Sequence, residues 1–130
     1  MREILFRAKS ADNYPYPSRW EYGVPFEDLF GDYMMRTSGR LVEVKKETVG
    51  EYTGLTDKNG VKIFEGDIVT YPVGIRRYKG KIIFWCATFC IEHFYPKDLI
   101  TTLDDCATDC KIVGNIYNNP ELLGGDDNAE

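Results

Sequence analysis

The sequence lacks any hydrophobic run approaching the roughly 20 residues that a membrane helix needs. Residues 1–7 (MREILFR) are too few and too charged to form a signal peptide, so we expect no leader. We therefore expect no membrane partner and a cytoplasmic location.

Motifs of enzyme active sites are also missing. There is no Gly-x-Ser-x-Gly elbow, no His-Glu-x-x-His, no Walker loop and no dinucleotide fingerprint. His93 is the single histidine, so a nucleophilic triad would have to use it as the base. A histidine between Glu92 and Phe94 on an expected strand is more often a surface or half-buried side chain. We expect no catalytic residue, no cofactor and no small-molecule substrate.

An excess of basic charge, the usual mark of a nucleic-acid binder, is absent. The net charge is −5, and the acidity is concentrated near the C-terminus. Residues 1–103 carry 15 basic and 14 acidic side chains, whereas residues 104–130 carry one and seven.

One local basic cluster lies among aromatic side chains. It supplies the candidate nucleic-acid-binding residues Arg76, Arg77, Lys79, Lys81, Tyr78 and Trp85. Such a surface could hold a phosphate backbone and stack bases. Alternatively, these charges mark a hairpin end that discourages edge pairing, and we favour that reading. The acidic C-terminal residues could also meet this cluster, within one chain or across a subunit interface.

Four cysteines form two similar pentapeptides. They are Cys86, Cys90, Cys106 and Cys110. Four thiolates could bind zinc, but Cys86 and Cys90 fall in an expected strand, where their Cα atoms would lie about 13 Å apart. We therefore expect no metal, and we expect small buried side chains with exposed thiols most readily at Cys106 and Cys110.

Aromatic residues make up 14% of the chain and favour sheet. Short strands are expected at residues 3–8, 41–44, 48–55, 68–71, 81–85, 89–94 and 111–117. Residues 56–60 (TDKNG) predict a hairpin turn with positive φ at Gly60, and Asp67 is expected to brace the turn at Gly66. Gly turns between short strands are typical of a small barrel or a tightly bent sheet.

The remaining segments predict less regular structure. Residues 11–25 read either as a loop ordered by its aromatic side chains or as a plain surface loop. Residues 26–35 follow Pro25 and have apolar positions at helical spacing, so a short helix is expected. A helical turn is also expected at 95–100.

Three blocks carry a resemblance to a known family. They are residues 1–8 (MREILFRA), residues 52–60 (YTGLTDKNG) running into 63–69 (IFEGDIV), and residues 112–123 (IVGNIYNNPELL). In this order they resemble the YopX family of phage and prophage proteins. The resemblance implies a mostly β fold with an SH3-like barrel portion, a bacterial host cell and self-association, and it brings no catalytic residues.

Together these readings predict a mainly β protein with little helix. We expect residues 1–50 to form an N-terminal extension that packs on a β-barrel-like core at 51–123, with a disordered acidic tail at 124–130. The expected function is that of a non-enzymatic phage accessory protein that forms a homo-oligomer, and a nucleic-acid-binding module is the alternative.

Overall fold

The computed structural model describes residues 3–12, 17–94 and 99–122. The chain divides into two compact units, unit 1 at Met1–Tyr52 and unit 2 at Thr53–Glu130. The elements are β1 (Phe6–Lys9), β2 (Trp20–Glu27), β3 (Tyr33–Thr37), β4 (Arg40–Glu43), η1 (Lys46–Thr48), β5 (Gly50–Thr56), β6 (Lys62–Phe64), β7 (Asp67–Val73), β8 (Arg76–Trp85), β9 (Thr88–His93), β10 (Ile100–Thr102), η2 (Leu103–Asp105), η3 (Ala107–Asp109), β11 (Lys111–Asn115) and η4 (Pro120–Leu122).

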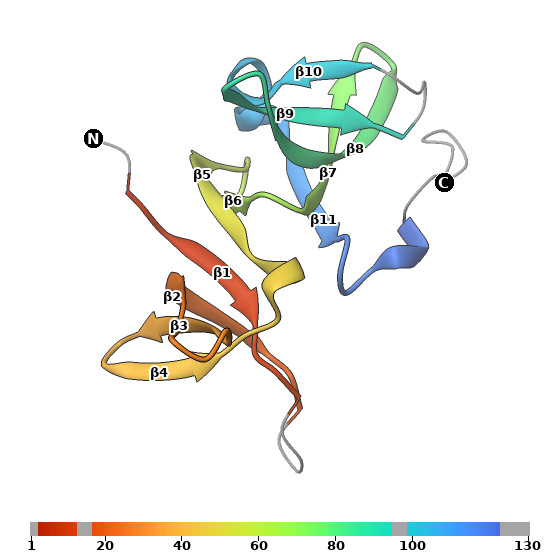
Figure 1. Ribbon diagram of the computed structural model, residues 1–130. Coiled ribbons are helices and arrows are strands. Elements are labelled where there is room, and N and C mark those ends of the chain that lie inside the picture. Colours follow the sequence, from red (N-terminus) through yellow and green to blue (C-terminus); the bar gives the residue numbers. More distant parts are fainter. Residues whose placement is uncertain (1–2, 13–16, 95–98, 123–130) are drawn as a thin grey trace. The chain divides into compact units, whose positions relative to one another are not determined.

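The described strands form two antiparallel sheets, with the orders β4-β3-β2-β1-β5-β6 and β10-β9-β8-β7-β11 (Figure 1). The described residues include no α-helix and form no closed barrel. The mainly β prediction is thus confirmed, whereas the SH3-like barrel is not found. No helix in the described ranges is long and apolar enough to cross a membrane.

Unit 1 is a curled sheet whose first and fourth strands also meet. Ser10, just after β1, forms an isolated bridge with Val44, just after β4. The N–H of Ala11 donates to the carbonyl of Glu43 at 2.9 Å. A Cβ at Gly23 would lie 2.0 Å from the carbonyl oxygen of Arg36, so this close approach of β2 to β3 needs glycine.

Strand alternation gives unit 1 an inner and an outer face. Ala8, Met35 and Val44 form a buried cluster on the inner face. The outer face carries Tyr22 and Val24 of β2 and Leu41 of β4, all of which are exposed. The core of this unit is therefore small, and one face of its sheet remains open to solvent.

The helix predicted at residues 26–35 is wrong. These residues form the end of β2, a tight turn and the start of β3, with Phe26 paired to Met34 and Glu27 to Tyr33. The predicted loop at 11–25 is also partly strand, since β2 begins at Trp20. Pro25 is tolerated within β2, and the apolar spacing that resembled a helix instead serves two strands and the turn between them.

Unit 2 buries most of its apolar side chains on one face of its five-stranded sheet. Val69, Ile82 and Ile91 lie on neighbouring strands of this face and belong to the same cluster as Ile63 and Leu103. β8 begins at Arg76 and is longer than the strand predicted at 81–85. A helical turn is predicted at 95–100, but Ile100 belongs to β10, and residues 95–98 lie outside the described residues. The tail predicted at 124–130 also lies outside them.

Asp57 joins the turn after β5 to a distant strand. Its Oδ1 accepts the N–H groups of Asn59 and Val61 at 2.8 and 3.0 Å, and its Oδ2 accepts the N–H of Ile112 at 3.1 Å. Gly60 has φ +82°, which confirms the predicted turn. Burial alone would raise the pKa of Asp57, but the backbone donors outweigh burial and hold the pKa below its ordinary value.

Asp67 fills a similar role at the next turn. Its Oδ2 accepts the N–H of Phe64 at 2.8 Å, which confirms the predicted brace. Gly66 has φ +94°, and a Cβ there would lie 3.1 Å from Cε2 of Tyr117. The turn therefore needs glycine both for its backbone conformation and for its packing.

The turn between β8 and β9 is strained. Trp85 pairs with Thr88, so the loop consists of two residues, Cys86 and Ala87, with φ values of +53° and +65°. Two-residue hairpin loops with positive φ at both positions usually contain Asn-Gly, because other L-residues meet steric strain there.

We expect replacement of this loop by Cys86→Asn with Ala87→Gly to raise the unfolding free energy of unit 2 by about 1 kcal/mol, since strain relief exceeds the added chain entropy. Urea unfolding followed by the tryptophan fluorescence would measure it. The matched comparison is Ser38→Asn in the β3–β4 turn, which should give a smaller gain because Gly39 already occupies one of the two positive-φ positions there. If the double variant is no more stable than the parent protein, the Cys86-Ala87 loop is not strained.

We also expect Asp57→Asn to lower the unfolding free energy by about 1–3 kcal/mol, because it removes a charged acceptor from buried backbone donors. The folded-state pKa of Asp57 lies below the unfolded value, so its stabilisation is complete above about pH 4 and is lost as the pH falls through the folded pKa. Denaturation curves between pH 7 and pH 2 should show a shallower acid loss in Asp57→Asn. Asp104→Asn, at an exposed site, should behave as the parent protein.

Candidate functional site

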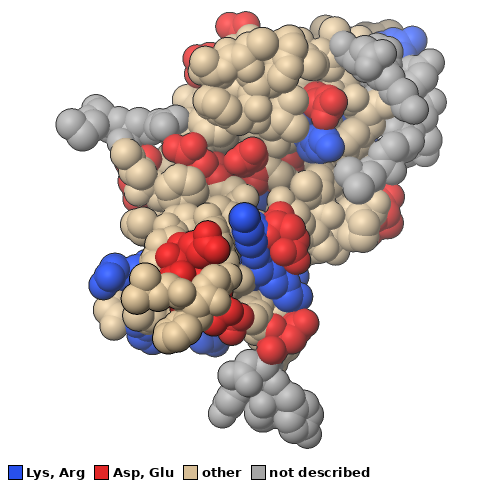
Figure 2. Space-filling view, viewed as in Figure 1, with Lys and Arg blue, Asp and Glu red and all other residues tan. Residues whose placement is uncertain are grey.

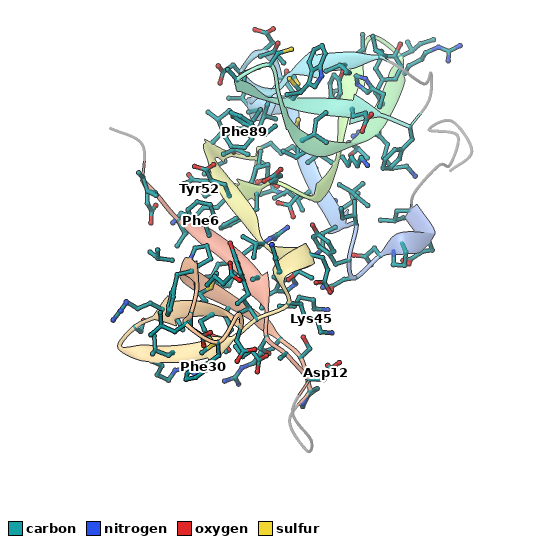
Figure 3. All side chains as sticks on the ribbon, viewed as in Figure 1. Phe6, Asp12, Phe30, Lys45, Tyr52 and Phe89 are labelled. Atoms are coloured by element: carbon teal, nitrogen blue, oxygen red, sulfur yellow. The ribbon has the colours of Figure 1, made fainter. Side chains whose placement is uncertain are left out.

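The turn between β2 and β3 presents two bulky apolar side chains to solvent. Leu29 and Phe30 are 99% and 88% exposed. The Oδ1 of Asp28 accepts the N–H groups of Phe30 and Asp32, both at 2.9 Å, and the Asp28 N–H donates to the Asp32 carbonyl at 2.9 Å. Gly31 completes the turn with φ +85°. We call residues 27–32 the apolar tip (Phe30 is labelled in Figure 3).

The outer face of unit 1 combines apolar and basic side chains. Val24 pairs with Arg36 across β2 and β3, and Arg36 pairs with Leu41 across β3 and β4, so the three side chains share one face. Tyr22 lies on the same face of β2. All four residues are exposed. We call this set the outer patch.

Unit 2 also exposes apolar side chains at hairpin ends. Ile75, in the turn between β7 and β8, is fully exposed, and Phe84 and Trp85 are about half exposed beside the strained loop. The Phe84 ring contacts the ring of Phe89 edge-on, with centroids 5.0 Å apart. These side chains are more scattered than the pair on the apolar tip.

Strand alternation separates the predicted nucleic-acid-binding residues. Arg77, Lys79, Lys81 and Trp85 lie on one face of β8, whereas Arg76 and Tyr78 lie on the other.

The environments of these side chains also differ. The Tyr78 ring packs against the core and against Tyr71 and His93, with centroids 5.9 and 5.5 Å apart. Lys79 is buried, and Lys81 pairs with Glu92 at 3.6 Å. On the face shown in Figure 2, unit 2 carries few basic side chains. The described residues thus offer no continuous basic and aromatic platform here, and nucleic-acid binding stays a prediction.

The four cysteines lie in two separate pairs. Among the described residues, no three His, Cys, Asp or Glu side chains gather where they could hold a metal ion. Cys86 is exposed, while Cys90, Cys106 and Cys110 are buried. The expectation that Cys106 and Cys110 would be the exposed thiols is wrong, because η2 and η3 fold these residues onto the core of unit 2.

The surroundings of two buried cysteines, Cys90 and Cys110, raise the pKa values of their thiols. The hydrogen-bonded thiol of Cys106, together with burial, raises the pKa of Cys110. Burial, and then the charge of Cys86, raises the pKa of Cys90. The thiols of Cys90 and Cys110 therefore remain protonated near neutral pH, and Cys86 is the accessible cysteine.

His93 is 3% exposed, so the expectation of a surface or half-buried side chain is wrong. Its Nδ1 lies 2.9 Å from the Leu99 carbonyl oxygen, which can only accept, so Nδ1 carries the proton. Its Nε2 lies 2.7 Å from the Tyr71 hydroxyl oxygen, and the Thr101 hydroxyl lies 3.3 Å from that same oxygen. The ring is held by structural hydrogen bonds within the core of unit 2.

A groove of about 690 Å³ opens in unit 1, at a place where the sequence predicted no site. It is lined by Ser10, Ala11, Asp12, Pro17, Arg19, Glu21, Arg40, Leu41, Val42 and Glu43. Glu21 is 7% exposed, and its two carboxylate oxygens accept from Nε of Arg19 at 3.0 Å and from a terminal nitrogen of Arg40 at 3.2 Å. No motif marks this site, because its charged residues come from β4, from β2 and from the ends of the segment between β1 and β2.

We predict that a thiol reagent added to the native protein labels one cysteine per chain quickly, namely Cys86. Labelling followed by absorbance would show one fast equivalent, and four in denaturant. Cys86→Ser should abolish the fast phase. Rapid reaction of two or more thiols would contradict the burial of the other three.

Comparison with known proteins places the chain in a family. The pattern of the YopX family, described as YopX protein, matches residues 21–124, which is most of the chain. The crystal structure of protein EF1440 from Enterococcus faecalis is similar, with a TM-score of 0.57 and 26% sequence identity over 95% of this chain and 99% of that one. No curated protein matches. The resemblance seen in the sequence is thereby confirmed, and the chain belongs to the YopX family.

Proposed function

We propose that this protein is a non-enzymatic accessory protein of a phage or prophage that works by binding further copies of itself. The phage setting rests on the family resemblance. The observation that carries the proposal of self-association is the apolar tip, where Leu29 and Phe30 are almost completely exposed on a hydrogen-bonded turn.

Exposure on an ordered turn favours association for two reasons. Burial of a leucine or phenylalanine side chain contributes about 1.5–3 kcal/mol, so this pair supplies a substantial driving force. A turn already braced by Asp28 also has less conformational freedom to lose when it binds, and preorganisation of this kind strengthens binding.

The outer patch of a second copy is the proposed receptor for the apolar tip. Its exposed Tyr22, Val24 and Leu41 provide apolar area, and Arg36 lies between Val24 and Leu41. The tip is acidic, since Glu27 and Asp32 flank its apolar pair. The two surfaces thus match in apolar character and are opposite in charge, which favours one orientation of docking.

We expect the parent protein to be oligomeric at tens of micromolar, as measured by size-exclusion chromatography with light scattering. Leu29→Ser with Phe30→Ser should raise the dissociation constant about a hundredfold, because two buried apolar side chains are lost. Ile75→Ser, which removes an exposed apolar side chain elsewhere, is the matched control and should leave the oligomer intact. A clean monomer of the parent protein would refute self-association.

A charge exchange tests the receptor. Asp32→Arg and Arg36→Asp should each weaken the oligomer, whereas the two together should restore part of the affinity. The side chain of Asp32 takes no part in the hydrogen bonds that define the turn, which use its backbone. If the tip variants weaken the oligomer but the double charge exchange restores no affinity, the apolar tip docks on a surface other than the outer patch.

A further inference from the structure

We propose that the groove of unit 1 is a binding site for an oxyanion, a carboxylate or a phosphate monoester, which the guanidinium groups of Arg19 and Arg40 hold. This site is distinct from the apolar tip and does not depend on the proposed self-association, and it shares one residue, Leu41, with the outer patch. Its members come from β2, β4, the residues that follow β1 and the residues that precede β2.

The buried carboxylate of Glu21 organises the site. It sits between the two arginines and accepts one N–H from each, at 3.0 and 3.2 Å. Hydrogen bonds and ion pairs of this kind fix the directions of two side chains that would otherwise move freely, since Arg19 and Arg40 are 71% and 55% exposed.

The free donors of the two arginines suit an anion, although the lining as a whole carries two basic and three acidic side chains. Both oxygens of Glu21 already accept hydrogen bonds, and its side chain is more than nine-tenths buried. Each guanidinium carries five N–H donors and uses one toward Glu21. Among the described residues, the others have no protein acceptor. Paired guanidinium groups match carboxylate and phosphate oxygens in geometry.

The rim of the groove limits the affinity. Asp12 pairs with Nζ of Lys45 at 3.3 Å (both are labelled in Figure 3), so its charge is compensated, while Glu43 adds a negative charge. On the face of unit 1 shown in Figure 2, acidic and basic side chains are interspersed rather than gathered by sign. Because the charges nearly balance, we expect a small oxyanion ligand to bind this groove with a dissociation constant of about a millimolar.

The rest of the lining defines the ligand further. Ala11, Pro17, Leu41 and Val42 provide apolar wall, and a volume of about 690 Å³ lies in the range of small-molecule sites. The structure therefore fits an oxyanion joined to a compact apolar body.

Titrations of the isotope-labelled full chain, followed by amide and arginine Nε–H resonances, test the proposal. The probes are benzoate, phenyl phosphate and benzyl alcohol. Both anions should shift the signals of Arg19, Arg40 and Ser10, and the stronger binder identifies the source of the oxyanion as carboxylate or phosphate. The uncharged alcohol should bind at least tenfold more weakly. Equal binding of all three probes, or no shifts at tens of millimolar, would overturn the site.

Two single variants identify the groups that bind. Arg19→Gln and Arg40→Gln each leave one arginine to pair with Glu21, which protects the fold, and each should weaken anion binding about tenfold. Arg76→Gln, at an exposed arginine of unit 2, is the matched control and should leave binding unchanged. Anion binding that survives both groove variants would refute the assignment. Because the groove shares Leu41 with the outer patch, the titrations are repeated on the Leu29→Ser with Phe30→Ser variant, which makes the result independent of whether the chain self-associates.

Discussion

Aspartate carboxylates that accept backbone N–H groups hold the turns of this fold, and much of what the protein presents to solvent depends on them. Asp28 orders the apolar tip, Asp57 joins the turn after β5 to β11, and Asp67 closes the turn that leads into β7. Short strands joined by tight turns leave many backbone donors without a partner in the sheet. An aspartate side chain that lies a few residues away in the sequence accepts hydrogen bonds from those donors at little cost in chain entropy.

The sequence predicts the turns and most strands well, because both are encoded locally. Asn59-Gly60 and the spacing of Asp57 specify a hairpin without reference to the rest of the chain, and the structure agrees. The helix expected at residues 26–35 fails for a related reason. Four apolar residues at helical spacing there belong to two strands and a turn, and the choice between them depends on pairing with β4 and β2 rather than on local preference.

The candidate sites are harder to predict, since they depend on which strand faces meet. The basic cluster near Arg76 looks continuous in sequence, but alternation sends its members to opposite faces of β8 and buries Lys79. In the groove, by contrast, residues that are separated in the sequence meet in space. Arg19, Glu21 and Arg40 look unrelated in the sequence, and the curl of β2 toward β4 brings them within hydrogen-bonding distance. Pairing register, which distant residues set, decides both outcomes.

The contact between the ends of β1 and β4 bears on how copies of this protein can join. A strand at the border of a sheet normally offers its backbone as a template on which another chain can add, and repeated addition leads to fibrils. In unit 1, the Ala11 N–H already occupies the Glu43 carbonyl, and Ser10 bridges to Val44. Sheet extension past this end of β4 would first have to break those bonds, so growth by strand addition is opposed there while docking through side chains is left open.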